Sequence, residues 1–144
     1  MVDTFQSKVL ERKWLTKDVI LLSITASETF SFKAGQYVMF KITTDGMTKL
    51  KPYSILSPPS QKGKLDFCIK IIDNGHASEA FKEIKVADEL TVKGPFGHFV
   101  FNMESPANEY WFIGTGTGLG PLYSMILEHL PTYPVFRDSI GNVL

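Results

Sequence analysis

The chain has 144 residues, 44% of them hydrophobic, and its 15 basic and 15 acidic residues give a formal net charge of zero. A neutral chain without a basic block gives no electrostatic reason to expect nucleic acid or an acidic membrane as a partner. Its apolar runs are shorter than the roughly 20 residues of a membrane span. Its polar N-terminal segment does not resemble a signal peptide.

The single cysteine, Cys68, excludes an internal disulfide. It also excludes an iron–sulfur cluster ligated by this chain alone, which needs about four cysteines, and we expect no metal site. One thiol fits a reducing, cytoplasmic environment. Because Cys68 alternates with apolar neighbours in a strand-like run, we expect a small buried packing residue rather than a reactive thiol.

Short strands dominate the first hundred residues. Apolar alternation or short β-branched runs predict strands at 19–24, 37–42, 51–56 and 65–72. In the second of these, Val38, Phe40 and Ile42 share one face. Asp45-Gly46 and Asp73-Asn74-Gly75 are turn signals between strands.

One helix interrupts the strands, because Ala77, Ala80, Phe81 and Ile84 recur at helical spacing. Leu90 and Val92 restart the strand pattern, 94–97 is predicted to turn, and Phe99 and Phe101 are expected in the core. Five or six short strands with one helix predict a mainly β fold. We expect a small antiparallel Greek-key barrel over residues 1–103.

A second segment, 104–144, has a different character. Residues 104–109 are expected to form a linker, and Tyr110 to Ile113 form an apolar run typical of a strand buried on both faces. A glycine run and an apolar helix beginning near Pro121 follow. This is one strand–turn–helix unit of a partial α/β, Rossmann-like nucleotide domain. A complete domain needs on the order of 100 residues, so we expect the chain to hold only its truncated start.

The run Lys51-Pro52-Tyr53-Ser54 carries the first chemical signal. A flavin needs an aromatic wall for its ring, a hydrogen-bond partner near N5, and cations for its phosphates. Strand alternation places Tyr53 on one face beside Lys51, with Ser54 pointing the other way. Taken alone, Tyr53 fits a half-buried strand tyrosine equally well.

The second signal is Gly75-His76-Ala77-Ser78 at the start of the predicted helix. Free N–H groups at a helix N-terminus bind phosphate, and a serine hydroxyl adds a donor. The alternative is a plain turn in which Ser78 caps the helix. We expect His76 to be a solvated loop histidine.

The third signal is the glycine run from Gly114 to Pro121. A strand, a glycine turn and a helix form the device that binds a dinucleotide phosphate with backbone donors and the helix dipole. The run departs from the strict G-x-G-x-x-G spacing, and a tight loop between strand and helix is the alternative.

Five motifs in this order resemble the ferredoxin–NADP reductase superfamily over about residues 5–130: residues 32–37, 51–54, 75–78, 94–97 and 113–121. The resemblance implies that Tyr53 stacks on the isoalloxazine and that Ser54 bonds near N5. Lys51, within the motif that includes Pro52, is implied to meet the flavin phosphates. The other implied contacts are the backbone of Ile69, Lys70 and Ile71 at the ring edge, Gly75, Ala77 and Ser78 at the phosphate, and Thr115, Gly116 and Thr117 between flavin and nicotinamide.

The activity that the resemblance implies is hydride transfer from NAD(P)H to an FAD cofactor, with FMN possible. Electrons then pass to ferredoxin, flavodoxin or an oxygenase component. The alternative is a non-catalytic flavin-binding module, or a truncated reductase whose nicotinamide domain is missing or lies on another chain. A barrel without any cofactor, used for interaction, is a third hypothesis. Lys51 stands where the family usually has arginine, and lysine lacks the planar fork that grips phosphate with two bonds.

Overall fold

The computed structural model describes residues 2–102, 104 and 110–129. The predicted linker at 104–109 therefore lies almost wholly outside the described residues. The elements, in chain order, are β1 (Asp3–Trp14), β2 (Val19–Thr25), β3 (Tyr37–Thr44), β4 (Met47–Ser54), β5 (Lys64–Lys70), α1 (His76–Glu83), β6 (Glu89–Phe96), the 3-10 turn η1 (Gly116–Gly118) and α2 (Leu119–His129). Neither helix has the length and apolar character needed to cross a membrane.

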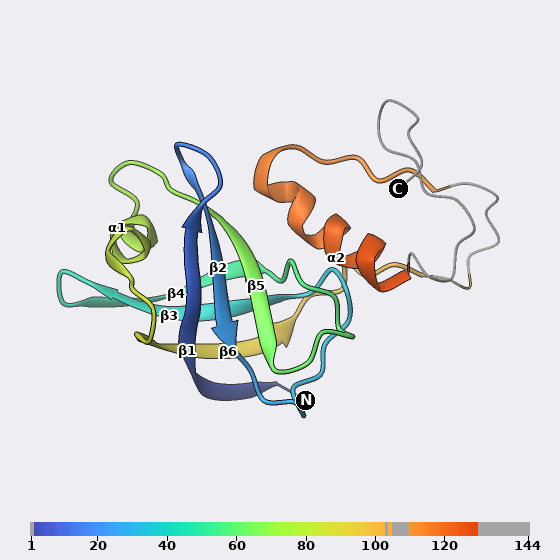
Figure 1. Ribbon diagram of the computed structural model, residues 1–144, viewed down its shortest axis with the longest axis horizontal. Helices are drawn as coiled ribbons and strands as arrows, with labels where there is room; N and C mark the ends of the chain where they lie inside the picture. Colours follow the sequence, from blue (N-terminus) through green and yellow to red (C-terminus); the bar gives the residue numbers. More distant parts are fainter. Residues whose placement is uncertain (1, 103, 105–109, 130–144) are drawn as a thin grey trace.

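The strands form one antiparallel sheet in the order β4-β3-β6-β1-β2-β5. In Figure 1, β3, β4 and β6 cross behind β1, β2 and β5, while α1 and α2 lie at opposite ends of this curled sheet. The predicted mainly β, antiparallel barrel with one helix in the barrel segment is confirmed.

Strand β1 belongs to both layers of the barrel. Residues 3–8 pair with β6, residues 9–14 pair with β2, and the register shifts between Val9 and Glu11. Such a bulge lets one strand turn the corner between two layers. The sequence analysis predicted no strand here, because only Phe5, Ser7 and Val9 turn inward along a polar stretch. Ser7 is buried without cost because its Oγ donates to the Thr25 carbonyl at 2.6 Å.

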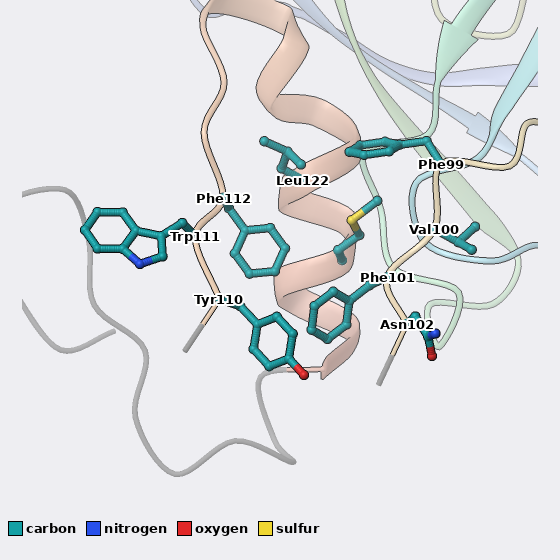
Figure 2. A pocket seen from close by; sticks show the side chains of 9 residues that line it. Phe99, Val100, Phe101, Asn102, Tyr110, Trp111, Phe112 and Leu122 are labelled. Carbon is teal, nitrogen blue, oxygen red and sulfur yellow. The ribbon is translucent and has the colours of Figure 1, made fainter. Parts of the chain in front are cut away.

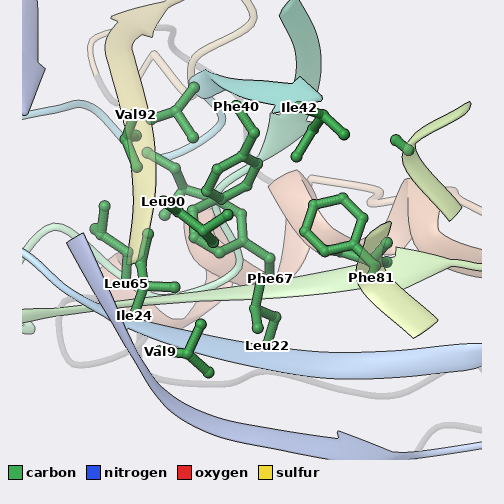
Figure 3. Close-up of a cluster of buried hydrophobic side chains, with 14 of the residues drawn as sticks. Val9, Leu22, Ile24, Phe40, Ile42, Leu65, Phe67, Phe81, Leu90 and Val92 are labelled. Carbon is green, nitrogen blue, oxygen red and sulfur yellow. The ribbon is translucent and has the colours of Figure 1, made fainter. Parts of the chain in front are cut away.

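The core lies between the two layers and is filled by aliphatic and aromatic side chains from both (Figure 3). The predicted face of β3 is confirmed: Val38, Phe40 and Ile42 are all buried. Phe40 is central, since its ring centroid lies 5.0 Å from that of Phe67 and 5.8 Å from that of Phe81. Phe81 thereby joins α1 to the barrel.

The hairpin between β3 and β4 is set by Asp45-Gly46. Both residues have positive φ, 52° and 71°, as the two-residue type I′ turn requires. This turn fixes a register in which Tyr37 faces Ser54 and Ile42 faces Lys49. The predicted turn is therefore confirmed, and it positions the first chemical motif on an edge strand.

Three predictions near the second segment are wrong. Residues 94–96 continue β6 instead of turning, and Gly94 packs so closely on β3 that an added Cβ would lie 2.8 Å from Val38 Cγ1. Phe99 is 63% exposed. Residues 110–113 form no strand with the described part of the chain, and Trp111 and Ile113 are 78% and 82% exposed.

Helix α2, by contrast, forms as predicted and docks on the barrel. The buried Ser124 donates its hydroxyl to the Ser57 carbonyl at 2.8 Å. The Ser60 N–H donates to Glu128 Oε2 at 2.9 Å. Met125 packs beside Gly35, where an added Cβ would lie 2.3 Å from Met125 Cε and 2.1 Å from the Phe99 carbonyl oxygen. Helix α2 is thus held against the barrel by the hydrogen bonds of Ser124 and Glu128 and by the packing of Met125 beside Gly35.

We expect Gly35→Ala to destabilise the fold by at least about 3 kcal/mol, because φ is +99° and the new methyl would strike backbone. Gly46→Ala is the matched control, with φ +71° and nothing within 4 Å of the new Cβ. It should cost only about 1 kcal/mol. Denaturant unfolding of both variants measures the difference, and equal losses would contradict the packing assigned to Gly35.

Candidate functional site

The two edges of the sheet are β4 and β5. The chain just after β4 joins β5 only at its start, where the Leu56 N–H donates to the Asp66 carbonyl at 2.8 Å and the Asp66 N–H donates to Ser57 Oγ at 3.1 Å. Backbone groups in a strand alternate in direction, so those of Cys68 and Lys70 face this same edge. We call the space between strand β4 and the backbone of Cys68 and Lys70 on β5 the β4–β5 opening.

This alternation separates the residues of β5 that the resemblance grouped together. The side chains of Ile69 and Ile71 lie in the core, and the Ile71 N–H donates away from the opening, to the Asp18 carbonyl at 2.7 Å. Lys70 presents its backbone to the opening. Cys68 does so too, and the sequence analysis missed it, because the direction of a backbone group is known only once the partner strand is known.

Tyr53 lies on the β4 side of the opening. It faces Val38 in the ladder and therefore shares the core face of the sheet. Its ring centroid lies 5.3 Å from that of Phe81 at 83°, and 5.6 Å from that of Phe40. Burial raises the pKa of the Tyr53 phenol. Tyr53 is thus a half-buried strand tyrosine on an edge strand, where a planar ligand can approach it.

The neighbours of Tyr53 divide between the two faces of β4. Ser54 and the exposed Pro52 face Tyr37 and Met39 in the ladder, on the outer face. Lys51 faces Phe40 and lies on the same face as Tyr53.

A second lysine shares this face. Lys49 faces Ile42 and is exposed. The sequence analysis missed Lys49, although its spacing of two residues from Lys51 could have indicated a shared face.

The start of α1 lies against the β3–β4 hairpin. The His76 Nε2 lies 3.2 Å from the Ile42 carbonyl, to which it must be the donor, and the Thr44 hydroxyl donates to the His76 carbonyl at 2.9 Å. The half-buried His76 is therefore a tether between helix and hairpin, and the prediction of a solvated loop histidine is wrong.

Ser78 does not cap the helix. The N-cap residue is Gly75, which has no side chain to cap the helix, and Ser78 Oγ accepts the Ile72 N–H at 2.9 Å. Gly75 has no room for a side chain, because an added Cβ would lie 2.9 Å from Ser78 Oγ and 3.0 Å from the Ile72 carbonyl oxygen. Ala77 and Ser78 are buried. The motif forms a compact turn that leads from β5 into α1.

The first helical hydrogen bond of α1 runs from the Glu79 N–H to the Gly75 carbonyl, at 3.2 Å. The N–H groups of residues 76–78 precede it, as the first N–H groups of a helix do. With Lys49 and Lys51 on the adjoining face of β4, this end of the opening can hold an anion.

The glycine turn lies at the other end of the opening. A cavity of about 370 Å³ is lined by residues of β5, of the segment after β4 and of the turn: Leu56, Cys68, Gly116, Thr117, Leu119, Gly120 and Tyr123. Gly116 has φ +55°, while Thr115 is extended and exposed and does not line the cavity. Two of the three predicted residues therefore meet β5, close to Cys68.

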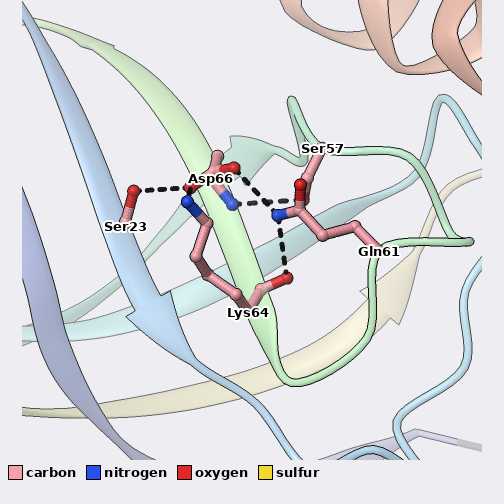
Figure 4. A network of polar contacts seen from close by, with 5 residues as sticks. All are labelled: Ser23, Ser57, Gln61, Lys64 and Asp66. Atoms are coloured by element: carbon pink, nitrogen blue, oxygen red, sulfur yellow. Dashed lines mark hydrogen bonds and ion pairs between the residues drawn. The ribbon is translucent and has the colours of Figure 1, made fainter.

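A polar network supports this end of the barrel (Figure 4). Asp66 accepts hydrogen bonds from the Ser23 hydroxyl and from Gln61 Nε2, and Lys64 Nζ lies 3.2 Å from its carboxylate. Burial, with a smaller contribution from the Asp66 charge, raises the pKa of the Cys68 thiol. This direction favours the packing residue over the reactive thiol, although Cys68 is half-buried and not buried as expected.

A second cavity, of about 320 Å³, lies beside α2 and away from the opening. Figure 2 shows Phe101, Tyr110 and Phe112 gathered against the helix, with Trp111 turned outward. The ring centroids of Phe101 and Tyr110 lie 4.8 Å apart. This aromatic cluster keeps residues 110–112 beside α2 although they form no strand.

Comparison with known proteins connects this geometry to a family. Residues 6–101 match the oxidoreductase FAD-binding domain family. The reductase component of a Pseudomonas phenol 2-monooxygenase is 33% identical over 110 residues, which cover 76% of this chain and 30% of that protein. The ferredoxin–NADP reductase of Pseudomonas aeruginosa is 30% identical over 129 residues, which cover 89% of this chain and 50% of that one.

Among solved structures, the Amycolatopsis cytochrome P450 reductase superposes with a TM-score of 0.82 at 24% identity, over 94% of this chain and 41% of that one. This similarity shows a shared fold. In each of these three comparisons, the chain spans half or less of the relative's length.

The raised pKa of Tyr53 predicts a pH dependence of stability. The folded chain holds the phenol proton more tightly than the unfolded chain does. The contribution of Tyr53 to the free energy of unfolding is therefore fully present below about pH 10 and is lost as the pH rises from there through the raised pKa of the folded chain. Tyr53→Phe should remove this contribution. Unfolding of both proteins from about pH 8 to about pH 11 tests it, and identical pH profiles would contradict it.

Proposed function

The chain belongs to the oxidoreductase FAD-binding domain family, and on this basis we propose that it binds FAD in the β4–β5 opening, as the flavin-binding part of an NAD(P)H-dependent reductase. The observation that carries the proposal is that this opening combines three parts: an aromatic ring on β4, a free backbone edge on β5, and helix N–H groups beside two lysines. A flavin nucleotide needs such parts for its ring and its phosphates.

Different residues along the opening would contact different parts of the flavin. Tyr53 offers the wall for the ring, and Ser54, at the end of the edge strand, offers a hydroxyl near N5. Lys70 and Cys68 offer backbone donors and acceptors, whereas Ile69 and Ile71 support that edge from the core. At the helix end, the backbone N–H groups of Ala77 and Ser78 and the ammonium groups of Lys51 and Lys49 would bind the phosphates. The Gly75 N–H already donates to the Ile72 carbonyl at 3.0 Å, so Gly75 contributes by forming the turn into α1. Pro52 stiffens the strand between Lys51 and Tyr53.

The glycine turn provides the entry for a hydride donor. A flavin held in the opening would supply hydride-accepting chemistry toward NAD(P)H and one- or two-electron transfer onward. Gly116 and Thr117 line the cavity beside β5 together with the apolar Leu56 and Leu119, and the exposed Thr115 precedes them in the turn. A nicotinamide would approach the ring from this side. FMN fits the same parts, since it shares the ring and one phosphate.

The domain assignment follows the family match. We assign residues 1–103 to the flavin-binding barrel and 104–144 to the start of an NAD(P)-binding domain; the match to residues 6–101 supports the first boundary. Relatives named as ferredoxin–NADP reductase and as an oxygenase reductase component support an electron-carrier protein, such as ferredoxin or flavodoxin, or an oxygenase as partner. The single cysteine supports a reducing, cytoplasmic location.

One observation favours a second function, that of a flavin-binding module whose nicotinamide domain comes from elsewhere. Trp111 and Ile113 are largely exposed, and residues 110–113 form no strand with the described part of the chain. An exposed apolar segment of this kind is normally covered by another part of the protein or by a partner. In that case, the barrel binds flavin while another chain supplies the pocket for the hydride donor.

Flavin binding and reduction test the two functions in order. The purified chain should bind FAD with a perturbed flavin absorbance spectrum, and anaerobic NADH or NADPH should bleach that spectrum in a stopped-flow instrument. Binding without bleaching would favour the module, and the absence of any flavin binding would overturn the proposal as a whole.

The lysines on β4 give a more specific expectation. Lys49→Gln and Lys51→Gln should each weaken FAD binding about tenfold, because each removes one charge-assisted contact to phosphate. Lys41→Gln is the matched control, since Lys41 is exposed on the outer face of the same hairpin, opposite Leu50. Fluorescence titration with FAD measures the three affinities; an equal loss in Lys41→Gln would show a general charge effect instead.

A further inference from the structure

Helix α1 is too short to hold its own position. It has eight residues, and isolated helices below about 12 residues are marginal in water. Its orientation therefore depends on what it contacts. The N-terminal end is tethered by His76 and Thr44, as described above. The C-terminal end is held by a residue of β1, 70 positions earlier in the chain.

That residue is Arg12 on β1. Its Nη2 donates to the Lys82 carbonyl at 3.0 Å, and Lys82 lies in the last turn of α1. The carbonyls of a last helical turn have no partner inside the helix, so this bond satisfies one of them. It also places a guanidinium at the negative end of the helix dipole, where a cation is stabilised.

The Arg12 side chain is itself held in one place. Its Cζ lies 4.7 Å from the centroid of the Trp14 ring, a cation–π contact on the same strand. None of the ion pairs between described residues includes Arg12. Its Nε is buried and has no hydrogen-bond partner within the described part of the chain. Burying an unpaired N–H is unfavourable. The hydrogen bond to Lys82 and the contact with Trp14 hold the guanidinium against the helix despite this cost.

We propose that Arg12 is a positioning residue for flavin phosphate: it holds the C-terminal end of α1 so that the N–H groups of residues 76–78 face the phosphate in the β4–β5 opening. The inference rests on the proposed function, because it concerns the same site. It assigns to β1, an inner strand that is not one of the two strands flanking the opening, control over how well the phosphate is bound. Arg12 acts through the helix and not by touching the flavin.

The test compares flavins with and without phosphate. Arg12→Met keeps an apolar stem over Trp14 but removes the donor and the charge, and it should weaken FAD and FMN binding about fivefold to tenfold. Riboflavin has no phosphate, so its affinity should stay within about twofold. Arg12→Lys should recover part of the FAD affinity. Lys13→Met, at the exposed neighbouring position, is the matched control and should change neither affinity.

Three results would overturn the inference. An equal loss of FAD and riboflavin binding in Arg12→Met and in Arg12→Lys would show a general structural role. Unchanged FAD affinity in both variants would show that α1 needs no support from β1. If the wild-type chain binds neither FAD nor riboflavin, the proposed function fails first, and the inference falls with it. Thermal melts of each variant, run beside the titrations, confirm that the compared proteins are folded.

Discussion

The rest of this structure depends on the shared pairing of β1. Its first half pairs with β6 and its second half with β2, and the bulge between them turns one sheet back upon itself. The curl encloses the cluster around Phe40 and Phe67. It also brings the two unpaired edges, β4 and β5, to the same region of the molecule. An antiparallel sheet that closed fully would have no such edges, so the candidate site exists because the closure is incomplete.

The candidate site is built largely from backbone groups. The edge of β5 and the N-terminus of α1 both present peptide groups, and the N–H groups at a helix N-terminus favour an anion. Side chains add two things: the aromatic surface of Tyr53 and the charges of Lys49 and Lys51 on one face of β4. A chain with zero net charge thus concentrates positive charge where a phosphate would lie.

The second segment is joined to the barrel by hydrogen bonds and by close packing against a glycine. Ser124 and Glu128 bond to the chain between β4 and β5, and Met125 occupies the space that Gly35 leaves open. These contacts bring the glycine turn to the end of the opening near Cys68, opposite α1. The helix is therefore part of the site's framework, even though the apolar residues before it, Trp111 and Ile113, remain uncovered by the described residues.

The sequence by itself determined the elements whose signals are local: the alternating strands β3 and β5, the Asp45-Gly46 turn, the helix periodicities, and the motifs that place Tyr53 on a strand. Only the tertiary structure decided which backbone groups of β5 face the opening, because that depends on pairing with β2. It also decided that the polar β1 is a strand, and that the apolar residues 110–113 pair with no described strand. A strand is stabilised by its partners, and partners distant in the chain leave no periodic signal in the segment itself.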